Sequence, residues 1–276
     1  MRERHPPGHR RGPSGDTPAR RPDFQKPEAP SERMEDLKVI GPRAVEALFR
    51  FAPDRALRFF YTEETARMAG PFCSQLARMR KPYRQVSLEE MAKISGTPLH
   101  QGMVAIAQPK PEKRLDARAL EALRKKGGVH FVLDGVGNPH NLGAIARSLA
   151  FFGFKTLILT DHPDQAGLSS AAFRVAEGGL DALEVYRAPG FWSLMAEHGD
   201  RFRRVGTALS EKGVGLEALQ KGREATLVIL GNEERGLPRK ALDQCTEILT
   251  LPGSGIIQSL NVAQTAAILA YGLKRA

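Results

Sequence analysis

The stretch Leu251-Pro-Gly-Ser-Gly-Ile-Ile-Gln-Ser-Leu-Asn261 leads directly into the apolar segment Val262-Ala-Gln-Thr-Ala-Ala-Ile-Leu-Ala-Tyr-Gly-Leu273. Its beginning has the pattern of a strand end, and the proline and glycines that follow predict a turn. The apolar residues of the second segment recur at helical spacing, which predicts a helix with one buried face. A turn of this composition can hold backbone N–H and C=O groups against a ligand. Taken alone, the stretch favours a simpler interpretation, a terminal helix capped by Ser259 or Asn261.

Six short apolar segments end in or before this stretch, and helical patterns lie between most of them. They are Val129–Leu133, Thr156–Leu159, Leu183–Val185, Arg204–Ala208, Thr226–Leu230 and Glu247–Leu251. Strands that alternate with helices predict a largely parallel sheet with helices on both faces. In such sheets ligands bind at the carboxyl ends of the strands. We therefore expect a functional site in the loops that follow these segments.

The sequence upstream predicts a second, smaller α/β domain. Its strand segments are Ala56–Tyr61, Tyr83–Val86 and Met103–Ala107, and Ser87-Leu-Glu-Glu90 has the pattern of a helix capping box. The expected organisation is a disordered basic arm over residues 1–33, a small α/β domain over 34–108, a charged linker over 109–128 that is helical in part, and a larger α/β domain over 129–276. The arm fits either an electrostatic contact with RNA or an inert solvated tail.

The composition is that of a soluble protein with a polyanionic partner. The chain has 276 residues and a net charge of +10, which favours nucleic acid without indicating specificity. No apolar run is long enough to span a bilayer, and the N-terminus lacks the core of a signal peptide. Its 2 cysteines have no metal-ligand spacing, which fits a reducing cytosol. We therefore expect a cytoplasmic protein without a metal site.

The segment after the first strand of the larger domain, Asp134 to Ala150, contains a glycine-rich turn and a polar helix start. The turn does not have the spacing G-x-G-x-x-G, because His140 occupies the last position, so a dinucleotide site is not indicated. His140 itself has no evident partner for acid–base chemistry. Arg147 lies between apolar residues, so it needs either a structural carboxylate or an anionic substrate, and the sequence favours neither.

A second polar turn, Leu230-Gly-Asn-Glu-Glu-Arg-Gly236, follows the fifth strand of the larger domain. One interpretation is a loop with solvated charges. The other is that Glu233 or Glu234 holds an anion-binding arginine or a substrate hydroxyl. The Gly-x-Glu spacing favours Glu233, but it does not establish which carboxylate faces the site.

Three segments, taken together, resemble the motifs of the SpoU (TrmH-type) branch of the SPOUT methyltransferases in order and spacing. They are Asn138 to Ser148, Leu230 to Leu237, and Leu251 to Val262. The resemblance covers about residues 129–273, and the smaller domain looks like the N-terminal substrate-binding domain of that family. It implies 2′-O-methylation of ribose in rRNA or tRNA, with S-adenosylmethionine as donor and S-adenosylhomocysteine as product. It also implies a C-terminal trefoil knot and a homodimer through the C-terminal domain, with each active site completed across the interface.

The resemblance implies roles for particular residues. Arg147 would bind the target phosphate and assist deprotonation of the hydroxyl, Asn141 would position the substrate or orient Arg147, and Glu233 would steer this network. Ser259 and Asn261 would contact the substrate or hold the cofactor loop. The positions expected to line the cofactor pocket are Thr207, Ala208, Leu230, Gly231, Leu251 and Leu260.

One departure from the family's pattern concerns the run Ala176-Glu-Gly-Gly179, where many relatives carry a Ser-Ala-Gly-like sequence. Glu177 therefore bears on the choice of target and not on the reaction. The alternative to an enzyme is a non-catalytic RNA-binding protein that keeps the fold. The presence of all five catalytic candidates favours the enzyme.

Overall fold

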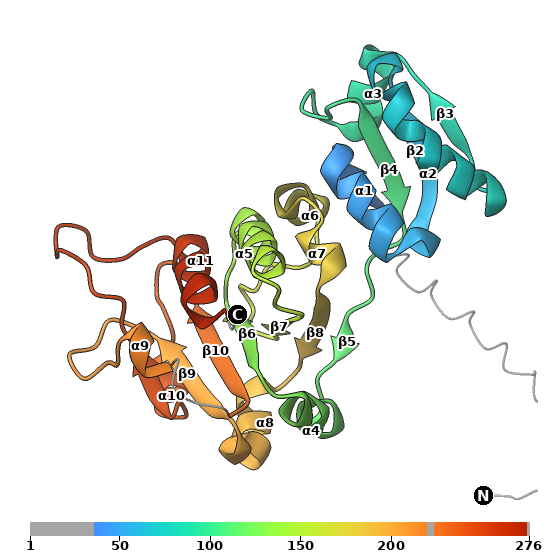
Figure 1. Ribbon diagram of the computed structural model, residues 1–276. Coiled ribbons are helices and arrows are strands. Elements are labelled where there is room, and N and C mark those ends of the chain that lie inside the picture. The colour runs from blue at the N-terminus through green and yellow to red at the C-terminus, as the bar shows by residue number, and fades with distance from the viewer. Residues whose placement is uncertain (1–35, 220–223, 275–276) are drawn as a thin grey trace, which may run out of the picture. The chain divides into compact units, whose positions relative to one another are not determined.

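A computed structural model describes residues 36–219 and 224–274 of the chain, which form two β-sheets and the helices around them (Figure 1). The predicted basic arm, residues 1–33, lies outside the described residues. None of the helices in the described ranges is long and apolar enough to cross a membrane.

The first sheet has four strands in the order β1-β4-β2-β3. Their bounds are Leu37–Ile40 for β1, Ala56–Tyr61 for β2, Tyr83–Gln85 for β3 and Met103–Ala107 for β4. Strand β4 is antiparallel to β1 and β2, whereas β2 and β3 are parallel. The sequence predicts β2, β3 and β4 but not β1, because Lys38 interrupts an apolar run of only four residues.

Three helices and two short 3-10 turns connect these strands. They are α1 (Pro42–Phe51), η1 (Pro53–Arg55), η2 (Glu63–Thr65), α2 (Ala66–Arg78) and α3 (Leu88–Ser95). Ser87 caps α3 by accepting a hydrogen bond of 3.2 Å from the Glu90 backbone N–H, as the sequence pattern predicts. Val45 and Leu48 of α1 are fully buried. Burial of a side chain of this size contributes about 1.5–3 kcal/mol, so α1 anchors this part of the fold.

The second sheet has seven strands, all parallel, in the order β11-β9-β10-β6-β7-β8-β5. Their bounds are Lys113–Arg114 for β5, Val129–Asp134 for β6, Thr156–Thr160 for β7, Glu184–Ala188 for β8, Arg203–Thr207 for β9, Thr226–Gly231 for β10 and Glu247–Leu249 for β11. All six strands expected in the larger domain are present, and the predicted parallel arrangement is confirmed. Strand β5 is an addition, since it comes from the segment expected to be a linker and pairs with β8 at the sheet edge.

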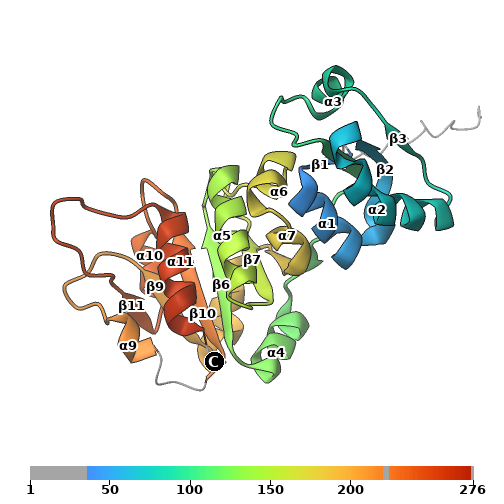
Figure 2. The ribbon, with the colours of Figure 1, turned by 45° about the horizontal axis from the view of Figure 1, so that its top comes forward.

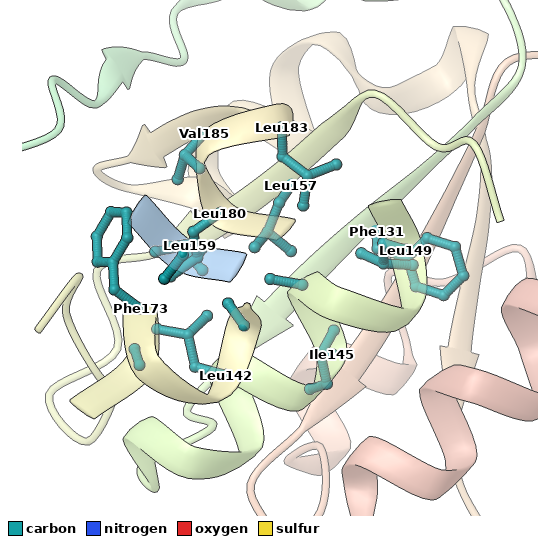
Figure 3. Packing of buried hydrophobic residues seen from close by; sticks show 14 of the residues in the cluster. Phe131, Leu142, Ile145, Leu149, Leu157, Leu159, Phe173, Leu180, Leu183 and Val185 are labelled. Atoms are coloured by element: carbon teal, nitrogen blue, oxygen red, sulfur yellow. The ribbon is translucent and has the colours of Figure 1, made fainter. Parts of the chain in front are cut away.

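Side chains alternate along these strands between two apolar cores, because successive residues of a strand point to opposite faces. Phe131 and Leu133 of β6 lie in one core, whereas Val132 lies in the other. The helices of this part are α4 (Ala117–Lys126), α5 (Pro139–Phe151), α6 (Ser170–Ala176), α7 (Gly179–Ala182), α8 (Phe191–His198), η3 (Gly199–Arg201), α9 (Leu216–Leu219), α10 (Arg239–Leu242) and α11 (Val262–Leu273). Residues of α5, α6, α7 and α11 pack in the first core, part of which Figure 3 shows. Residues of α4, α8 and α10 pack in the second. Helices thus cover both faces of the sheet, as expected.

A buried ion pair connects the two parts of the described chain. Arg55, at the end of η1, donates from Nη1 to Oδ1 of Asp181 in α7, and the Asp181 side chain has no exposed surface. The Arg55 Nε also donates to the backbone oxygen of Gln108, at 3.0 Å. Because a buried charge without a partner is costly, each member of this pair depends on the other.

The parallel direction of the second sheet places the carboxyl ends of its strands at one edge. Helix α5 begins shortly after β6, and α11 follows the loop after β11. These two helices lie side by side (Figure 2). Polar residues at both helix starts are therefore near each other, although 120 positions separate Asn141 from Asn261. The trefoil knot remains a prediction.

Candidate active site

Three of the predicted catalytic residues meet at the edge where β6, β10 and β11 end. The Asn141 side chain donates from Nδ2 to Oε1 of Glu233, at 2.8 Å. The Asn261 side chain donates from Nδ2 to Oδ1 of Asn141, at 3.1 Å. The amide of Asn141 thus links Glu233, in the turn after β10, to Asn261, the residue directly before α11.

Helix capping positions two of these residues. Asn138 caps α5, because its Oδ1 accepts from the His140 backbone N–H at 2.8 Å, and Asn141 lies in the first turn that follows. Asn261 caps α11, because its Oδ1 accepts from the Ala263 backbone N–H at 2.8 Å. The capping interpretation of Asn261 is therefore correct, and its amide nitrogen still reaches Asn141.

Glu233 is held by three donors. Besides Asn141, the backbone N–H groups of Gly137 and Asn138 donate to its carboxylate, at 3.1 and 3.3 Å. Partial burial by itself raises the pKa of Glu233, but the hydrogen bonds from Asn141 and from backbone N–H groups outweigh it and hold the pKa below its ordinary value. Glu233 is therefore an ionised acceptor at neutral pH.

The neighbouring carboxylate, Glu234, does not share this environment. Its side chain is exposed and makes no hydrogen bond or ion pair with any residue in the described ranges. Its backbone N–H donates to Oδ1 of Asn232, at 3.0 Å, as part of the turn. Of the two adjacent glutamates, Glu233 is the one that is hydrogen-bonded to Asn141.

Two residues outside the predicted set hold these loops together. Asn232 donates from Nδ2 to the backbone oxygen of Gly135, at 2.8 Å, and so ties the turn after β10 to the loop after β6. Gln165 accepts from the backbone N–H groups of Gly135 and Val136, both at 3.1 Å, and donates back to the Val136 oxygen. Asn232 could have been predicted to stabilise the turn, because Asn between glycines is typical of turns whose side chains bond to the backbone. No sequence pattern indicates a similar role for Gln165.

Arg147 and Ser259 are not part of this hydrogen-bonded group. Arg147 lies on α5, six residues beyond Asn141, which is about 9 Å along the helix and about 240° around it. Its partner is a carboxylate, since Arg147 Nη1 lies 2.7 Å from Glu177 Oε1. Ser259 is exposed, and its side chain makes no hydrogen bond with the described residues. His140 is also exposed, in agreement with the absence of a predicted partner.

Five of the six positions predicted for the cofactor lie at or just beyond the ends of β9, β10 and β11, and the sixth, Leu260, directly precedes the N-cap of α11. The Thr207 hydroxyl donates to the backbone oxygen of Ile229, at 3.0 Å, and Ala208 N–H donates to the oxygen of Leu249, at 3.1 Å. The Leu230 side chain is fully buried in the core, so only its backbone can meet a ligand. Leu251 is partly buried, and Leu260 is exposed.

Gly231 shows how tightly the turn after β10 closes. A Cβ atom at this position would lie 2.5 Å from backbone atoms of both Gly236 and Leu237. Only glycine allows this approach, because such a distance is a steric clash for any side chain. The loops after β9 and β11 also leave large apolar side chains unburied, among them Leu209, Ile256, Ile257 and Leu260. The described residues contain no group of three or more His, Cys, Asp or Glu side chains that could hold a metal ion.

The chain matches two family models. Residues 128–271 match the SpoU rRNA Methylase family. Residues 38–113 match the family described as RNA 2′-O ribose methyltransferase substrate binding. The two matched ranges contain the second and first sheets, respectively, apart from β5 and the first residue of β1.

Individual relatives align with most of this chain. A 23S rRNA (guanosine-2′-O-)-methyltransferase, RlmB, from Acinetobacter baylyi is 29% identical over 241 residues, which cover 84% of this chain and 94% of the relative. An uncharacterized tRNA/rRNA methyltransferase, YfiF, from Escherichia coli O157:H7 is 30% identical over 246 residues, which cover 86% of this chain and 68% of the relative. The crystal structure of an AdoMet-bound rRNA methyltransferase from Sinorhizobium meliloti has the same fold, with a TM-score of 0.67, 20% identity and 87% of each chain covered.

Proposed function

Because the chain belongs to the SpoU rRNA methylase family, we propose that it transfers a methyl group from S-adenosylmethionine to a ribose 2′-hydroxyl of rRNA or tRNA. The observation that carries this proposal is the hydrogen-bonded group Glu233–Asn141–Asn261, in which residues of all three motifs meet. The RNA substrate is supported by the match of residues 38–113 to an RNA substrate-binding family and by the relatives that methylate rRNA.

The loops at the strand ends fit S-adenosylmethionine. That cofactor, when bound, supplies a methyl group on a positively charged sulfur. Its adenine needs an apolar slot, and the unburied side chains of Ile256, Ile257 and Leu260 offer apolar surface in the loop between β11 and α11. We propose that backbone groups of Thr207, Ala208, Leu230, Gly231 and Leu251, together with Leu260, hold the cofactor.

Glu233 and Asn141 would orient the substrate. An ionised carboxylate can only accept hydrogen bonds, so the amide nitrogen of Asn141 faces Glu233 and its oxygen faces Asn261. These two bonds fix the orientation of the Asn141 amide, and with it the acceptor Oδ1, at the site where we place the ribose. A ribose hydroxyl is a poor nucleophile, and its alignment with the methyl group is a large part of what such a site can contribute. In this proposal Ser259 and Asn261 contact the substrate or hold the cofactor loop.

Arg147 would act in the site of a second copy of the chain. It lies about 9 Å along α5 from Asn141 and about 240° around the helix, and it pairs with Glu177, so we assign it to a different site from the group Glu233–Asn141–Asn261 of its own chain. The α5–α11 side carries exposed apolar residues, with Phe151 82% and Tyr271 73% exposed. Exposed apolar side chains on neighbouring helices are typical of an interface. We propose a homodimer through these helices, in which Arg147 binds the phosphate of RNA in the partner's site and assists deprotonation of the hydroxyl.

The division of labour and the location follow from the same proposal. Residues 34–108 would bind RNA, residues 129–276 would transfer the methyl group, and 109–128 would connect them. The net charge of +10 favours such a polyanionic partner. With rRNA or tRNA as substrate, the expected location is the cytoplasm.

The alternative is an RNA-binding protein without catalysis. The observation in its favour is that Arg147 is paired with Glu177 and separate from the other catalytic candidates. In that case the protein would bind RNA, but RNA methylation would be the same with and without it.

Mapping of 2′-O-methylated nucleotides in total RNA tests the proposal. RNA from the host is compared with RNA from a deletion strain that carries the wild-type gene, Arg147→Ala or the control Arg239→Ala. Arg239 is an exposed arginine paired with Asp243, on a different helix. We expect one site that is lost on deletion and restored by wild type and by Arg239→Ala, but not by Arg147→Ala. If Arg147→Ala restores the site, Arg147 is not required for methyl transfer. If the deletion strain has the same methylated sites as the host, the RNA-binding alternative is favoured.

A further inference from the structure

Glu177 occupies the position at Arg147 where an anion from RNA would bind. The distance from Arg147 Nη1 to Glu177 Oε1 is 2.7 Å, and the two side chains are 56% and 43% exposed. The pair is therefore open to solvent, and a ligand can reach it.

The backbone holds Glu177 in this place. Helix α6 ends at Ala176, and the C-cap residue Glu177 has a φ of 44°, in the left-handed region that residues other than glycine rarely adopt. A Cβ atom at Gly178 would lie 2.3 Å from Ala47 Cβ, and one at Gly179 would lie 2.8 Å from the Cα of Arg147. The turn is thus pressed between α1 and α5. The backbone of the turn therefore has little room to shift, which keeps the start of the Glu177 side chain within reach of Arg147.

The surroundings of the pair suit a nucleotide. A hollow of about 280 Å³ lies here, and its lining includes two arginines, Arg43 and Arg147, and the exposed aromatic side chain of Phe51. Glu177 is the one carboxylate among the lining residues. Arginines bind phosphates, and aromatic rings stack on unpaired bases. The lone negative charge therefore opposes the ligand that the other side chains favour.

We propose that Glu177 is a specificity-determining residue that competes with the RNA phosphate for Arg147. This inference rests on the proposed function, in which Arg147 receives a phosphate. A carboxylate and a phosphate both accept hydrogen bonds from a guanidinium, and they repel each other when they share it. RNA that contacts Arg147 alone does not displace Glu177. RNA that also contacts residues 38–113 and the hollow gains enough further contacts to displace Glu177.

RNA binding in a double-mutant cycle tests the competition. The proteins are wild type, Glu177→Gln, Arg147→Ala and the double variant, each without methyl donor, and the probe is a short fluorescein-labelled RNA of mixed sequence. Glutamine keeps the shape of the side chain and its backbone preference, so only the charge changes. The matched control is Glu184→Gln, since Glu184 is 40% exposed and pairs with Lys113 on another strand.

We expect Glu177→Gln to bind the probe about threefold more tightly, the size typical of an exposed ion pair. In the Arg147→Ala background the same change should give no gain, and Glu184→Gln should give none in either background. An equal gain without Arg147, or with Glu184→Gln, would mean that only net charge matters, and the proposal would be wrong.

Methylation kinetics separate this inference from the proposed function. With the mapped RNA, Glu177→Gln should lower KM for RNA by a similar factor without lowering kcat, and it should add methylated sites in total RNA. A fall in kcat with unchanged binding would mean that Glu177 orients Arg147 for the reaction, which contradicts competition. If wild type methylates no RNA, the proposed function fails, while the binding cycle still decides whether Glu177 competes at Arg147.

Discussion

Replacement of Glu233 by glutamine distinguishes the two adjacent glutamates. The Glu233 carboxylate accepts from three donors, and a glutamine side chain has only one acceptor oxygen. At least one N–H group must therefore lose its partner or face another N–H group. Because water reaches part of this site, we expect a cost of about 1 kcal/mol. For a protein of this size that is a fall in the thermal midpoint of about 2–4 °C.

The control is Glu234→Gln, which makes the same change of charge one residue later. Glu234 is exposed, so its replacement should change stability by less than about 0.5 kcal/mol. Thermal unfolding of the three proteins, followed by circular dichroism, measures both effects. Equal losses for the two variants, or a loss only for Glu234→Gln, would refute the assignment of Glu233 to the site.

The same comparison has a defined dependence on pH. The pKa of Glu233 in the folded protein lies below its ordinary value of 4.5. A lowered pKa means that the ionised carboxylate stabilises the fold at pH values above 4.5, and that this contribution is lost as the pH falls through the folded-state pKa. The stability difference between wild type and Glu233→Gln should thus be constant near neutral pH and shrink in acid. A difference that grows on acidification would contradict the hydrogen-bonding scheme.

Two further predictions concern packing. Gly143→Ala places a Cβ atom 2.4 Å from a backbone oxygen of α6, so it should lower the free energy of unfolding by about 1–3 kcal/mol. Gly70 lies in a helix with open space around it, so Gly70→Ala should be neutral or should raise that free energy by up to about 1 kcal/mol. Opposite shifts of the two thermal midpoints are expected, and equal shifts would show that α5 and α6 do not approach so closely. Asp181→Ala leaves the buried guanidinium of Arg55 without its carboxylate, so the free energy of unfolding in urea should fall by about 3–5 kcal/mol. Asp243 belongs to an exposed pair, so Asp243→Ala should lower that free energy by less than about 0.5 kcal/mol. A small effect at Asp181 would mean that the pair is not buried in solution.

The sequence predicted the second sheet better than the first. Six apolar segments with helices between them leave few arrangements other than a parallel sheet, and that prediction is confirmed. Strand β1 and strand β5 were not predicted, because four and two residues are too few for a recognisable pattern. Both are edge strands that owe their conformation to a neighbour and not to their own sequence.

The site shows a similar division. The order of the motifs indicated that Asn141, Glu233 and Asn261 belong together, and the structure brings them within hydrogen-bonding distance. The sequence did not decide between two partners for Arg147, and the structure supplies Glu177. Gln165 escaped prediction because its partners are backbone atoms of a distant loop. Such bonds depend on how distant loops pack against each other, and the spacing of residues in the sequence does not predict this.

The central claim is methyl transfer to a ribose hydroxyl, and analysis of the product tests it most directly. Purified wild-type protein is incubated with S-adenosylmethionine and total RNA from the deletion strain, and the RNA is digested to nucleosides for mass spectrometry. The account predicts an increase in one 2′-O-methylnucleoside that depends on Arg147. A methyl group on a base, or no methylated nucleoside despite bound cofactor, would contradict it.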